Sequence, residues 1–428
     1  MKRIKPLLIV RFNSAVLSGG RMRTYEILRH AKSEGIDYIV MTDSQSCANA
    51  TKIFPSYMET LSSYKVYMDS YAKGLRPRIP GLRQVFIYKN IIDCALLISR
   101  VAQEEDVDLI ISGSEDTEGL LTSFIAGTYC KKPWTAGYSG TTDITHPLPQ
   151  FDPLTIFNVL KFVSHESKSK NIPLISRIGI AWELLLHLKV AEMSTMLTVS
   201  SSIKEDFSYL DPKIKFQVID PGNGINLEKF PMWRRRAQDK EYDAIFFARL
   251  IPDKGIYELP VIWRLVTERV PKAKLAIAGP VENKKYVDDL EKMITKYDLS
   301  RNIVFLGEQN QKQLKRLIRS SKLTLNPSRL DSFSLMTLES LSCGVPVVAY
   351  DIPAMRHNFG KCDAVFRCPL KDNQDMAEKA LLILEEETLR KTLAKKAIEY
   401  SANYGWTKVV RAEKEAYFRV IENFKTVN

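Results

Sequence analysis

Residues 327–349, PSRLDSFSLMTLESLSCGVPVVA, predict a loop, a helix, a glycine stop and a buried strand in direct succession. Ser332 or Ser334 is placed to cap the helix, and Gly344 suits the left-handed position that follows a last helical turn. Leucines recur every three residues on one face of this helix: Leu335, Leu338 and Leu341. The amides at the start of such a helix would point toward the end of a sheet, where they favour an anion such as a phosphate.

The same alternation of short apolar runs and helical patterns extends along most of the chain. It is typical of βαβ units and a parallel sheet, and it restarts after residue 240, which predicts two doubly wound sheets. The runs before the restart are 7–10, 23–34, 38–41, 91–104 and 109–112. Those after it are 244–247, 256–268, 274–278, 287–297, 303–306, 311–320, 323–326 and 345–349.

Turn residues separate the two halves. Pro221, Gly222, Asn223 and Gly224 are followed by a polar, charged stretch, which predicts the linker between two domains. A chain of 428 residues with 45% hydrophobic residues is long and apolar enough for two cores. The expected division is a first domain over 1–222, a linker over 223–240, a second domain over 241–404 and a tail helix over 405–428.

Composition excludes some classes and leaves others open. Six scattered cysteines without a CxxC pair argue against a disulfide framework and a zinc site. Residues 178–200 are interrupted by charges, so no transmembrane helix is expected, and the start, MKRIKPLLIVRFN, predicts a strand rather than a signal peptide. These observations predict a cytoplasmic protein. The net charge of +12 favours a polyanionic partner, which nucleic acid, anionic lipid and a diphosphate substrate all satisfy.

Two motifs carry a family resemblance. Asp331 and Glu339 are separated by seven residues and followed by CGVPVVA, which resembles the E-x7-E segment of the retaining family-4 glycosyltransferases, within glycosyl transferases group 1. ARLIPDKGI, residues 248–256, resembles the G-R-L-x-x-x-K-G segment of the same family. Three further segments match family patterns: SGGRMRTYEIL, PGNGINLEKF and GWTKVV. The resemblance implies the GT-B fold, in which two Rossmann-like domains face each other across a cleft and a C-terminal helix crosses back to the first domain.

The resemblance also implies a donor site. Arg249 and Lys254 would grip the donor diphosphate, for which a guanidinium fork and an ammonium point charge are suited. Glu339 would bind the ribose hydroxyls and Asp331 the sugar hydroxyls. These four are the expected catalytic residues. The donor would also meet the backbone of Gly19, Gly20, Ser332, Phe333, Ser334 and Leu335.

The sequence departs from the family at three places. Asp331 is one methylene shorter than the usual glutamate. Ser332 and Ser334 stand where the family has glycines, so a positive φ there would strain a serine. Tyr138 and Ser139 occupy the place of a histidine common in the family, and His146 comes several residues too late, so no catalytic histidine is assigned.

Acidic residues follow the strand expected at 109–112. Glu115 and Asp116 would either stabilise the first turn of the next helix or, with Tyr138, bind the acceptor. A second open question is the stretch 73–89, which has five basic and no acidic residues: Lys73, Arg76, Arg78, Arg83 and Lys89. It is either a solvated loop or a site that docks on anionic lipid at the inner face of a membrane.

The expected reaction is transfer of a sugar from a UDP- or GDP-type nucleotide diphosphate sugar to a hydroxyl of a lipid-linked or glycan acceptor. The family implies retention at the anomeric carbon, with neither metal nor cofactor, and no metal-ligand cluster stands out in the sequence. Two alternative functions also fit parts of the sequence. A nucleotide-sugar epimerase or hydrolase on the same fold would need no acceptor. A nucleic-acid-binding protein would need a recognised module, which the sequence lacks.

Overall fold

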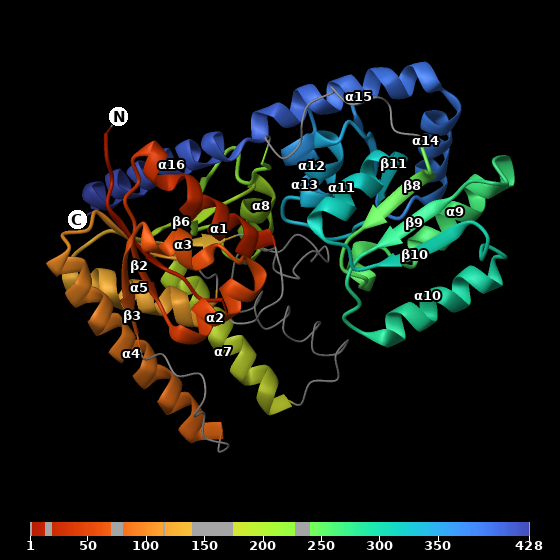
Figure 1. Cartoon of the computed structure of the whole chain (residues 1–428). Coiled ribbons are helices and arrows are strands. Elements are labelled where there is room, and N and C mark those ends of the chain that lie inside the picture. Colours follow the sequence, from red (N-terminus) through yellow and green to blue (C-terminus); the bar gives the residue numbers. More distant parts are fainter. Residues whose placement is uncertain are drawn as a thin grey trace. The chain divides into compact units, whose positions relative to one another are not determined.

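The computed structural model describes residues 2–12, 19–69, 80–113, 116–138, 174–226 and 240–427. The chain forms two compact units (Figure 1). Unit 1 comprises Met1–Asn223 together with Trp406–Asn428, and unit 2 comprises Gly224–Gly405. Most of the expected linker, residues 227–239, lies outside the described residues.

Unit 1 contains a seven-stranded sheet in the order β3-β2-β1-β4-β5-β6-β7, and the paired strands are parallel. Its strands are β1 (Pro6–Ile9), β2 (Ile39–Thr42), β3 (Lys65–Met68), β4 (Leu109–Ser112), β5 (Trp134–Tyr138), β6 (Thr195–Thr198) and β7 (Lys215–Val218). Its helices are α1 (Gly19–Ala31), η1 (Lys32–Glu34), α2 (Ser44–Ile53), α3 (Tyr57–Ser62), α4 (Pro80–Glu104), α5 (Thr117–Cys130), α7 (Leu174–Ala191), α8 (Ser201–Leu210) and α16 (Trp406–Val427).

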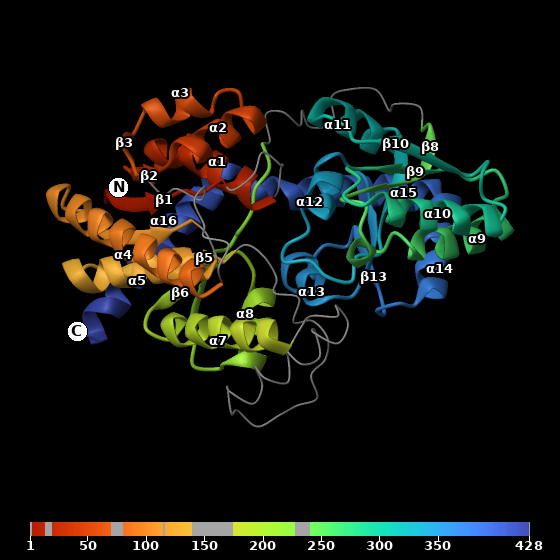
Figure 2. The same cartoon turned by 90° about the horizontal axis from the view of Figure 1, so that it is seen from below.

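Both faces of the central strand β1 are buried, which explains why its sequence is apolar without interruption. The edge strands β3 and β7 are partly exposed and contain polar residues. Leu7 and Ile9 of β1 pack into one core with α4, α5 and α7. Leu8 and Val10 point the other way, into a core with α1, α2, α3 and α16. Figure 2 shows α1, α2 and α3 on one side of the strands and α4 and α5 on the other.

The C-terminal helix α16 is part of unit 1, as the family resemblance implied. The hydroxyls of Tyr417 and Tyr38 lie 2.7 Å apart inside the core. Arg411 Nε donates to Glu34 at 2.7 Å, and Asn423 Nδ2 donates to Thr195 Oγ1 at 3.1 Å. The last helix is therefore held to unit 1 by both apolar burial and polar contacts.

Unit 2 contains a six-stranded parallel sheet in the order β10-β9-β8-β11-β12-β13. Its strands are β8 (Tyr242–Phe247), β9 (Leu275–Ala278), β10 (Ile303–Gly307), β11 (Ser321–Asn326), β12 (Val347–Tyr350) and β13 (Val365–Cys368). Its helices are η3 (Pro252–Lys254), α9 (Glu258–Arg269), α10 (Lys284–Lys296), α11 (Gln311–Arg319), α12 (Leu335–Ser342), α13 (Pro353–Phe359), α14 (Asn373–Glu385), α15 (Glu387–Ser401) and η4 (Ala402–Tyr404).

In each sheet, the direction in which successive strands are added reverses at one point. This switch point lies between β1 and β4 in unit 1 and between β8 and β11 in unit 2. Ligands of open parallel sheets bind beyond the carboxyl ends of the strands at such a switch point. The prediction of two Rossmann-like parallel sheets is therefore confirmed, and the chain offers two switch points at which a ligand can bind.

The segment 327–349 folds as its sequence predicts. Ser334, not Ser332, caps α12, and Gly344 has a φ of +72° just beyond its end. The amide of Gly344 donates to Leu341 O at 2.9 Å, and that of Val345 to Ser340 O at 3.0 Å. This pair of bonds is a Schellman motif, which satisfies carbonyls that the end of a helix leaves without partners.

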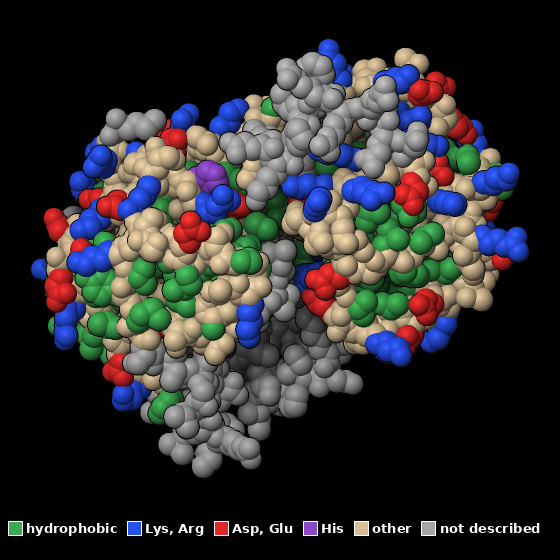
Figure 3. All heavy atoms as spheres, in the orientation of Figure 1, with side chains coloured by type: hydrophobic (Ala, Val, Ile, Leu, Met, Phe, Trp, Pro, Cys, Tyr) green, Lys and Arg blue, Asp and Glu red, His purple; other side chains and the backbone are tan. Residues whose placement is uncertain are grey.

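Basic and acidic side chains are interspersed with apolar ones on the face shown in Figure 3. Among the described residues on that face, the positive charge is therefore not gathered into a single basic patch. None of the helices in the described ranges combines the length and the apolar composition needed to cross a membrane.

Candidate functional site

Two loops of unit 2 meet at the switch point between β8 and β11. The first follows β8 and contains η3, and the second follows β11 and leads into α12. Gly255, with a φ of +77°, lets them touch, because a Cβ atom there would lie 2.0 Å from the carbonyl oxygen of Pro327. A glycine is therefore required at this position for steric as well as conformational reasons.

Arg329 ties the two loops together. Its amide donates to Asp253 O at 2.9 Å, and its Nη2 donates to Pro252 O at 2.9 Å. Ser328 Oγ donates to Leu330 O at 2.9 Å within the second loop. The position of Lys254 is thus set by the backbone contacts of Pro252 and Asp253 before it and by the close approach of Gly255 after it.

Lys254 and Asp331 form an ion pair across these loops, with 3.2 Å between Nζ and Oδ2. Lys254 Nζ also donates to Leu330 O at 3.1 Å. Two of the predicted site residues, 77 positions apart in the sequence, are therefore brought together by the fold.

Arg249 lies at the same end of β8 but has a different partner. Its Nη1 donates to Glu282 Oε1 at 2.8 Å, and its side chain is 51% exposed. Glu282 follows β9 and was not among the residues that the sequence analysis selected. The available signal was its place, because it lies beyond the carboxyl end of the strand next to β8.

Ser334 is the strained residue of the site. Its φ of +70° lies in the left-handed region, and the expectation that a serine replaces a glycine under strain applies to it and not to Ser332. Its amide donates to Asp331 Oδ1 at 3.2 Å, and its Oγ accepts from Asn326 Nδ2 at 3.0 Å. Its Oγ also accepts from the amide of Thr337 at 3.4 Å as the cap of α12. These bonds hold a conformation that costs a non-glycine residue of the order of 1 kcal/mol.

The neighbours of Ser334 anchor the loop. Phe333 is buried and packs edge to face against Phe359 and Tyr404, with ring centroids 5.7 and 6.0 Å away. The carbonyl of Ser332 accepts from Asn358 Nδ2 at 3.4 Å. Leu335, which is half-buried, begins α12.

Glu339 lies within α12 and turns toward α11. Burial raises the pKa of its carboxyl group to about 7, although the charge of Lys315 and a hydrogen bond with Gln311 act in the opposite direction. Both of these partners come from α11, and neither was predicted. The helix α11 connects β10 with β11, and the strand order puts β9 and β8 between these two strands. The contact of Glu339 with α11 therefore depends on the order of the strands in the sheet.

The residues expected on the acceptor side belong to unit 1. Asp116 caps α5, accepting from the amide of Gly119 at 2.7 Å, which is the role expected of an acid at a first helical turn. Tyr138 ends β5, and its hydroxyl lies 2.6 Å from Nε2 of the buried His187. Burial lowers the pKa of His187 to about 4. Glu115 and His146 lie outside the described residues.

Gly19 and Gly20 form the start of α1, and the preceding residues 13–18 are outside the described part of the chain. Gly20 lines a cavity of about 220 Å³ at the carboxyl ends of the strands of unit 1. The structure therefore places Gly20 and Tyr138 at one cavity of unit 1, and the four expected catalytic residues in unit 2.

Comparison with known proteins gives three kinds of similarity. Residues 230–400 match the family model described as glycosyl transferases group 1. An uncharacterised glycosyltransferase of Methanocaldococcus jannaschii is 32% identical over 179 residues, which are 39% of this chain and 44% of that protein. An N,N'-diacetylbacillosaminyl-diphospho-undecaprenol alpha-1,3-N-acetylgalactosaminyltransferase of Campylobacter jejuni is 26% identical over 211 residues, 47% of this chain and 54% of that one. The chain spans about half the length of the curated relatives it matches.

Solved structures extend the likeness to the whole fold. A glycosyltransferase of Rickettsia africae has a TM-score of 0.68 at 15% identity, covering 99% of this chain and 100% of that one. The Anabaena protein HepE, in complex with UDP and glucose, has a TM-score of 0.63 at 14% identity, covering 96% and 99%. The chain thus matches the glycosyl transferases group 1 model over nearly all of unit 2 and shares the GT-B fold of solved glycosyltransferases over almost its full length.

Proposed function

We propose that the chain is a retaining glycosyltransferase that moves a sugar from a nucleotide diphosphate sugar to an acceptor hydroxyl, without a metal ion. The observation that carries this proposal is the pairing of Lys254 with Asp331 at the switch point of unit 2. A cation for phosphate and a carboxylate for hydroxyls stand side by side there, in the part of the chain that matches the family model.

Charge on the departing diphosphate is the main electrostatic problem of the reaction. Glycosyl transfer passes through an oxocarbenium-like state, so preorganised positive groups at the leaving phosphate lower the barrier. Lys254 is held for this role by the contacts of the two loops. Arg249 supplies a second cation, which exchanges Glu282 for a phosphate oxygen when the donor binds.

The carboxylates divide the hydroxyls of the donor between them. Glu339, within α12, accepts from the ribose, and Asp331, beside Lys254, accepts from the transferred sugar. The backbone of the loop around Ser332 and Ser334 meets the remaining donor oxygens. The acceptor then attacks from the face that the diphosphate leaves, and a leaving phosphate oxygen takes the proton of its hydroxyl. The glycosidic bond forms as the bond between the anomeric carbon and the diphosphate breaks.

The relatives suggest which substrates to test first. The Anabaena structure holds UDP and glucose, which supports a uridine nucleotide as donor. The name of the Campylobacter relative includes a diphospho-undecaprenol acceptor, and another relative is a glycogen synthase of Mycobacterium tuberculosis, which is 21% identical over 229 residues. Lipid-linked and glycan acceptors are therefore the two classes to offer.

Nucleotide binding tests the donor site. The purified protein is titrated calorimetrically with UDP, GDP, ADP and their sugar conjugates, with EDTA present. We expect one nucleotide to bind, and Arg249→Ala and Glu339→Ala to weaken it at least about tenfold. Arg264→Ala is the matched control, because Arg264 also forms an exposed ion pair, at 3.3 Å to Glu268 on α9. Binding that is absent, or equal in all variants, contradicts the proposal.

We also propose that unit 1 docks on anionic lipid at the basic stretch 73–89. Residues 73–79 lie outside the described part of the chain. On α4, Tyr88, Ile92 and Leu96 are exposed at a spacing of four residues, which gives this helix an apolar stripe that begins within the basic stretch of the sequence. Lys89 is exposed too, 2.6 Å from Asp93.

Flotation with anionic vesicles tests this docking. Replacing Arg76, Arg78 and Arg83 by serine should abolish it, since each basic residue near the surface contributes on the order of 1 kcal/mol. Serine at Lys272, Lys284 and Lys285 of unit 2 removes the same charge from exposed positions and should leave flotation intact. Equal flotation of both triple variants would contradict docking of the basic stretch on anionic lipid.

A further inference from the structure

The chain passes between the two units twice, since it enters unit 2 at Gly224 and leaves it at Gly405. Directly inside unit 2 these two crossings pair with each other. Ile225 forms a parallel bridge with Gly405, and its amide donates to Tyr404 O at 2.8 Å. Ile225 and Tyr404 are both buried in the core of unit 2. The two ends of unit 2 are therefore held together by the backbone.

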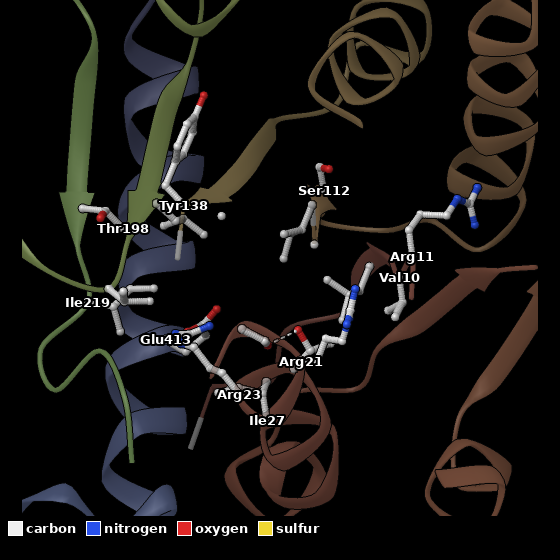
Figure 4. Close-up of a pocket in the computed structure, with 18 of the residues that line it drawn as sticks. Val10, Arg11, Arg21, Arg23, Ile27, Ser112, Tyr138, Thr198, Ile219 and Glu413 are labelled. Atoms are coloured by element: carbon white, nitrogen blue, oxygen red, sulfur yellow. Dashed lines mark hydrogen bonds and ion pairs between the residues drawn. The ribbon is translucent and has the colours of Figure 1, made fainter. Parts of the chain in front are cut away.

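Arg23 of α1 joins the other ends of the same two crossings inside unit 1. Its Nε donates to the carbonyl of Gly222 at 2.7 Å, and its Nη2 pairs with Glu413 of α16. Figure 4 shows Arg23 projecting from α1 toward Glu413. Tyr417 donates to the other carboxylate oxygen of Glu413 at 2.8 Å. Each unit thus fastens both crossings to its own structure.

Tyr404, next to the second crossing, packs against the loop that leads into α12. The ring of Phe333 is 3% exposed and meets the ring of Tyr404 edge to face, with centroids 6.0 Å apart. The ring of Phe359 lies 5.7 Å from that of Phe333 and 6.4 Å from that of Tyr404. Phe333 stands between Asp331 and Ser334, whose amide donates to Asp331 Oδ1. The rings therefore connect the loop of the candidate site with the second crossing.

Hydrogen bonds join the same two places. Tyr404 donates its hydroxyl to the carbonyl of Asn358 at 2.9 Å, and Tyr400 donates to the same carbonyl at 2.6 Å. Asn358 Nδ2 donates to the carbonyls of Ser332 and Phe333 at 3.4 and 3.5 Å. Asn358, on α13, thus binds the loop with its side chain and Tyr404 with its backbone.

These contacts form a continuous path within unit 2, from Asp331 to Ile225. Close-packed rings and buried hydrogen bonds resist displacement, so a shift at one end of the path is felt along it. The other end is a pair of connections between units, and such connections absorb the change in backbone angles when domains move. The path therefore joins the candidate site to the segments that a domain movement must deform.

We propose that Tyr404 and Asn358 are positioning residues that couple the loop of Asp331 to the backbone of both crossings. They act through Phe333 and Ser332. Binding of a donor at the loop then stabilises the crossings, and by thermodynamic linkage a change at the crossings alters the affinity for the donor by the same factor. The word donor rests on the proposed function, whereas the coupling rests on contacts within unit 2.

Amide hydrogen exchange of the full chain without ligand tests the coupling itself. The amide of Ile225 reports on the crossings, and that of Leu275, which donates to Asn302 O at 2.8 Å, reports on the sheet of unit 2. We expect Phe333→Leu to speed exchange at Ile225 about fivefold relative to Leu275, because two edge-to-face contacts are lost. Equal acceleration of both amides overturns the inference.

Phe246→Leu is the matched control. Phe246 is a fully buried ring of β8 in the same core, so its loss should not speed Ile225 more than Leu275. A selective effect on Ile225 from this variant as well would show that the crossings respond to any loss of packing, and would overturn the path through Phe333.

The second arm uses Tyr404→Phe, which removes only the hydroxyl and keeps the ring in the core. UDP and GDP are titrated onto this variant, and onto Tyr242→Phe as control. Tyr242 has the same exposure as Tyr404, 8%, and begins β8 at the end away from the candidate site. We expect Tyr404→Phe to weaken nucleotide binding about threefold, because an anchoring hydrogen bond of the loop is lost, and Tyr242→Phe to leave it unchanged.

The nucleotide that binds should also slow exchange at Ile225 relative to Leu275 in the wild type, and less so in Tyr404→Phe. A loss of stability without coupling would not change this difference between bound and free protein. If a nucleotide binds and leaves exchange at Ile225 unchanged, or if both tyrosine variants weaken binding equally, the inference is overturned and the proposed function stands. If neither nucleotide binds while Phe333→Leu still speeds Ile225 selectively, the coupling stands and the proposed function fails.

Discussion

Lys254 Nζ and Asp331 Oδ2 lie 3.2 Å apart, and both side chains are 18% exposed. A donor diphosphate must therefore compete with Asp331 for Lys254. Asp331→Asn should raise the affinity for UDP about two- to fivefold, because an exposed or half-exposed ion pair is worth up to about 1 kcal/mol. In the same variant, a UDP-sugar should bind no more tightly than UDP, because the carboxylate that accepts from the sugar hydroxyls is gone. Calorimetry of UDP and its sugar conjugates measures both, and weaker UDP binding would contradict this competition.

Gly255 sets the distance between the two loops of the donor site. Gly255→Ala should displace the loop of Lys254, since its Cβ atom would lie 2.0 Å from Pro327 O, and should weaken UDP binding at least about tenfold. Gly307→Ala is the control, because Gly307 also has a positive φ, +66°, but a Cβ atom there has no neighbour within 4 Å. It should cost about 1 kcal/mol of stability and leave UDP binding unchanged. Equal binding by both variants would contradict the steric argument.

Ser334 combines backbone strain with a buried cap. Ser334→Gly relieves the φ of +70° while losing the hydroxyl, so the two effects should cancel to within about 1 kcal/mol. Ser334→Ala keeps the strain and also leaves Asn326 Nδ2 without this acceptor, so it should cost about 2 kcal/mol. The free energy of unfolding of the two variants is measured in urea, with hydrogen exchange in β11 and α12 as the probe. An alanine variant as stable as the glycine variant would show that the cap contributes nothing.

Glu339 should make unit 2 less stable at high pH. Its pKa is raised to about 7 in the fold, above the ordinary value of 4.5, so the folded state holds a proton that the unfolded state loses. The contribution is fully present below pH 4.5 and is lost as pH rises through 7, by up to about 3 kcal/mol. Glu339→Gln should therefore stabilise the protein at pH 8 and not at pH 4.5.

The measurement is the free energy of unfolding between pH 4.5 and 8, from hydrogen exchange in peptides of unit 2. Glu399→Gln removes an exposed carboxylate from α15 of the same unit and should not reproduce the pH dependence. If wild type and Glu339→Gln differ equally at every pH, Glu339 is ionised in the folded state throughout.

His187 should have the opposite effect in unit 1. Burial lowers its pKa to about 4, below the ordinary value of 6.5, so the unfolded state takes up a proton first as the pH falls. Stability should fall between pH 6.5 and 4, by up to about 3 kcal/mol, and His187→Gln should lack this loss. Hydrogen exchange in β5 and α5 reports it, with the exposed His357 replaced by glutamine as control. A wild type with no acid loss relative to His187→Gln would contradict a buried, neutral imidazole.

Much of the fold was predictable because apolar residues recur at a characteristic spacing in helices and in strands. The strand at 109–112 was predicted at its observed bounds, and the helix at 91–104 was only the second half of α4, which begins at Pro80. Its first turns carry Pro80 and Gly81, residues that usually mark loops, so the helical pattern was recognised too late.

The chemistry of the candidate site was only partly predictable. A motif identified Asp331, Glu339, Arg249 and Lys254, and the glycine substitution identified Ser334 as a place of strain. Gln311 and Lys315 were missed, because nothing in their local sequence distinguishes them from solvated polar residues. Glu282 was missed although its place beyond β9 was a usable signal.

The sequence by itself thus determined many of the strands and helices, the glycine stop after α12 and the loops that follow the strands of the site. Local hydrogen bonds and apolar periodicity decide these features within about ten residues of chain. Only the tertiary structure decided that Lys254 meets Asp331, that Tyr138 meets His187 and that Arg23 meets Glu413, 390 positions away. Such contacts depend on the order of strands and on close packing between distant segments. The local spacing of apolar residues contains no information on either.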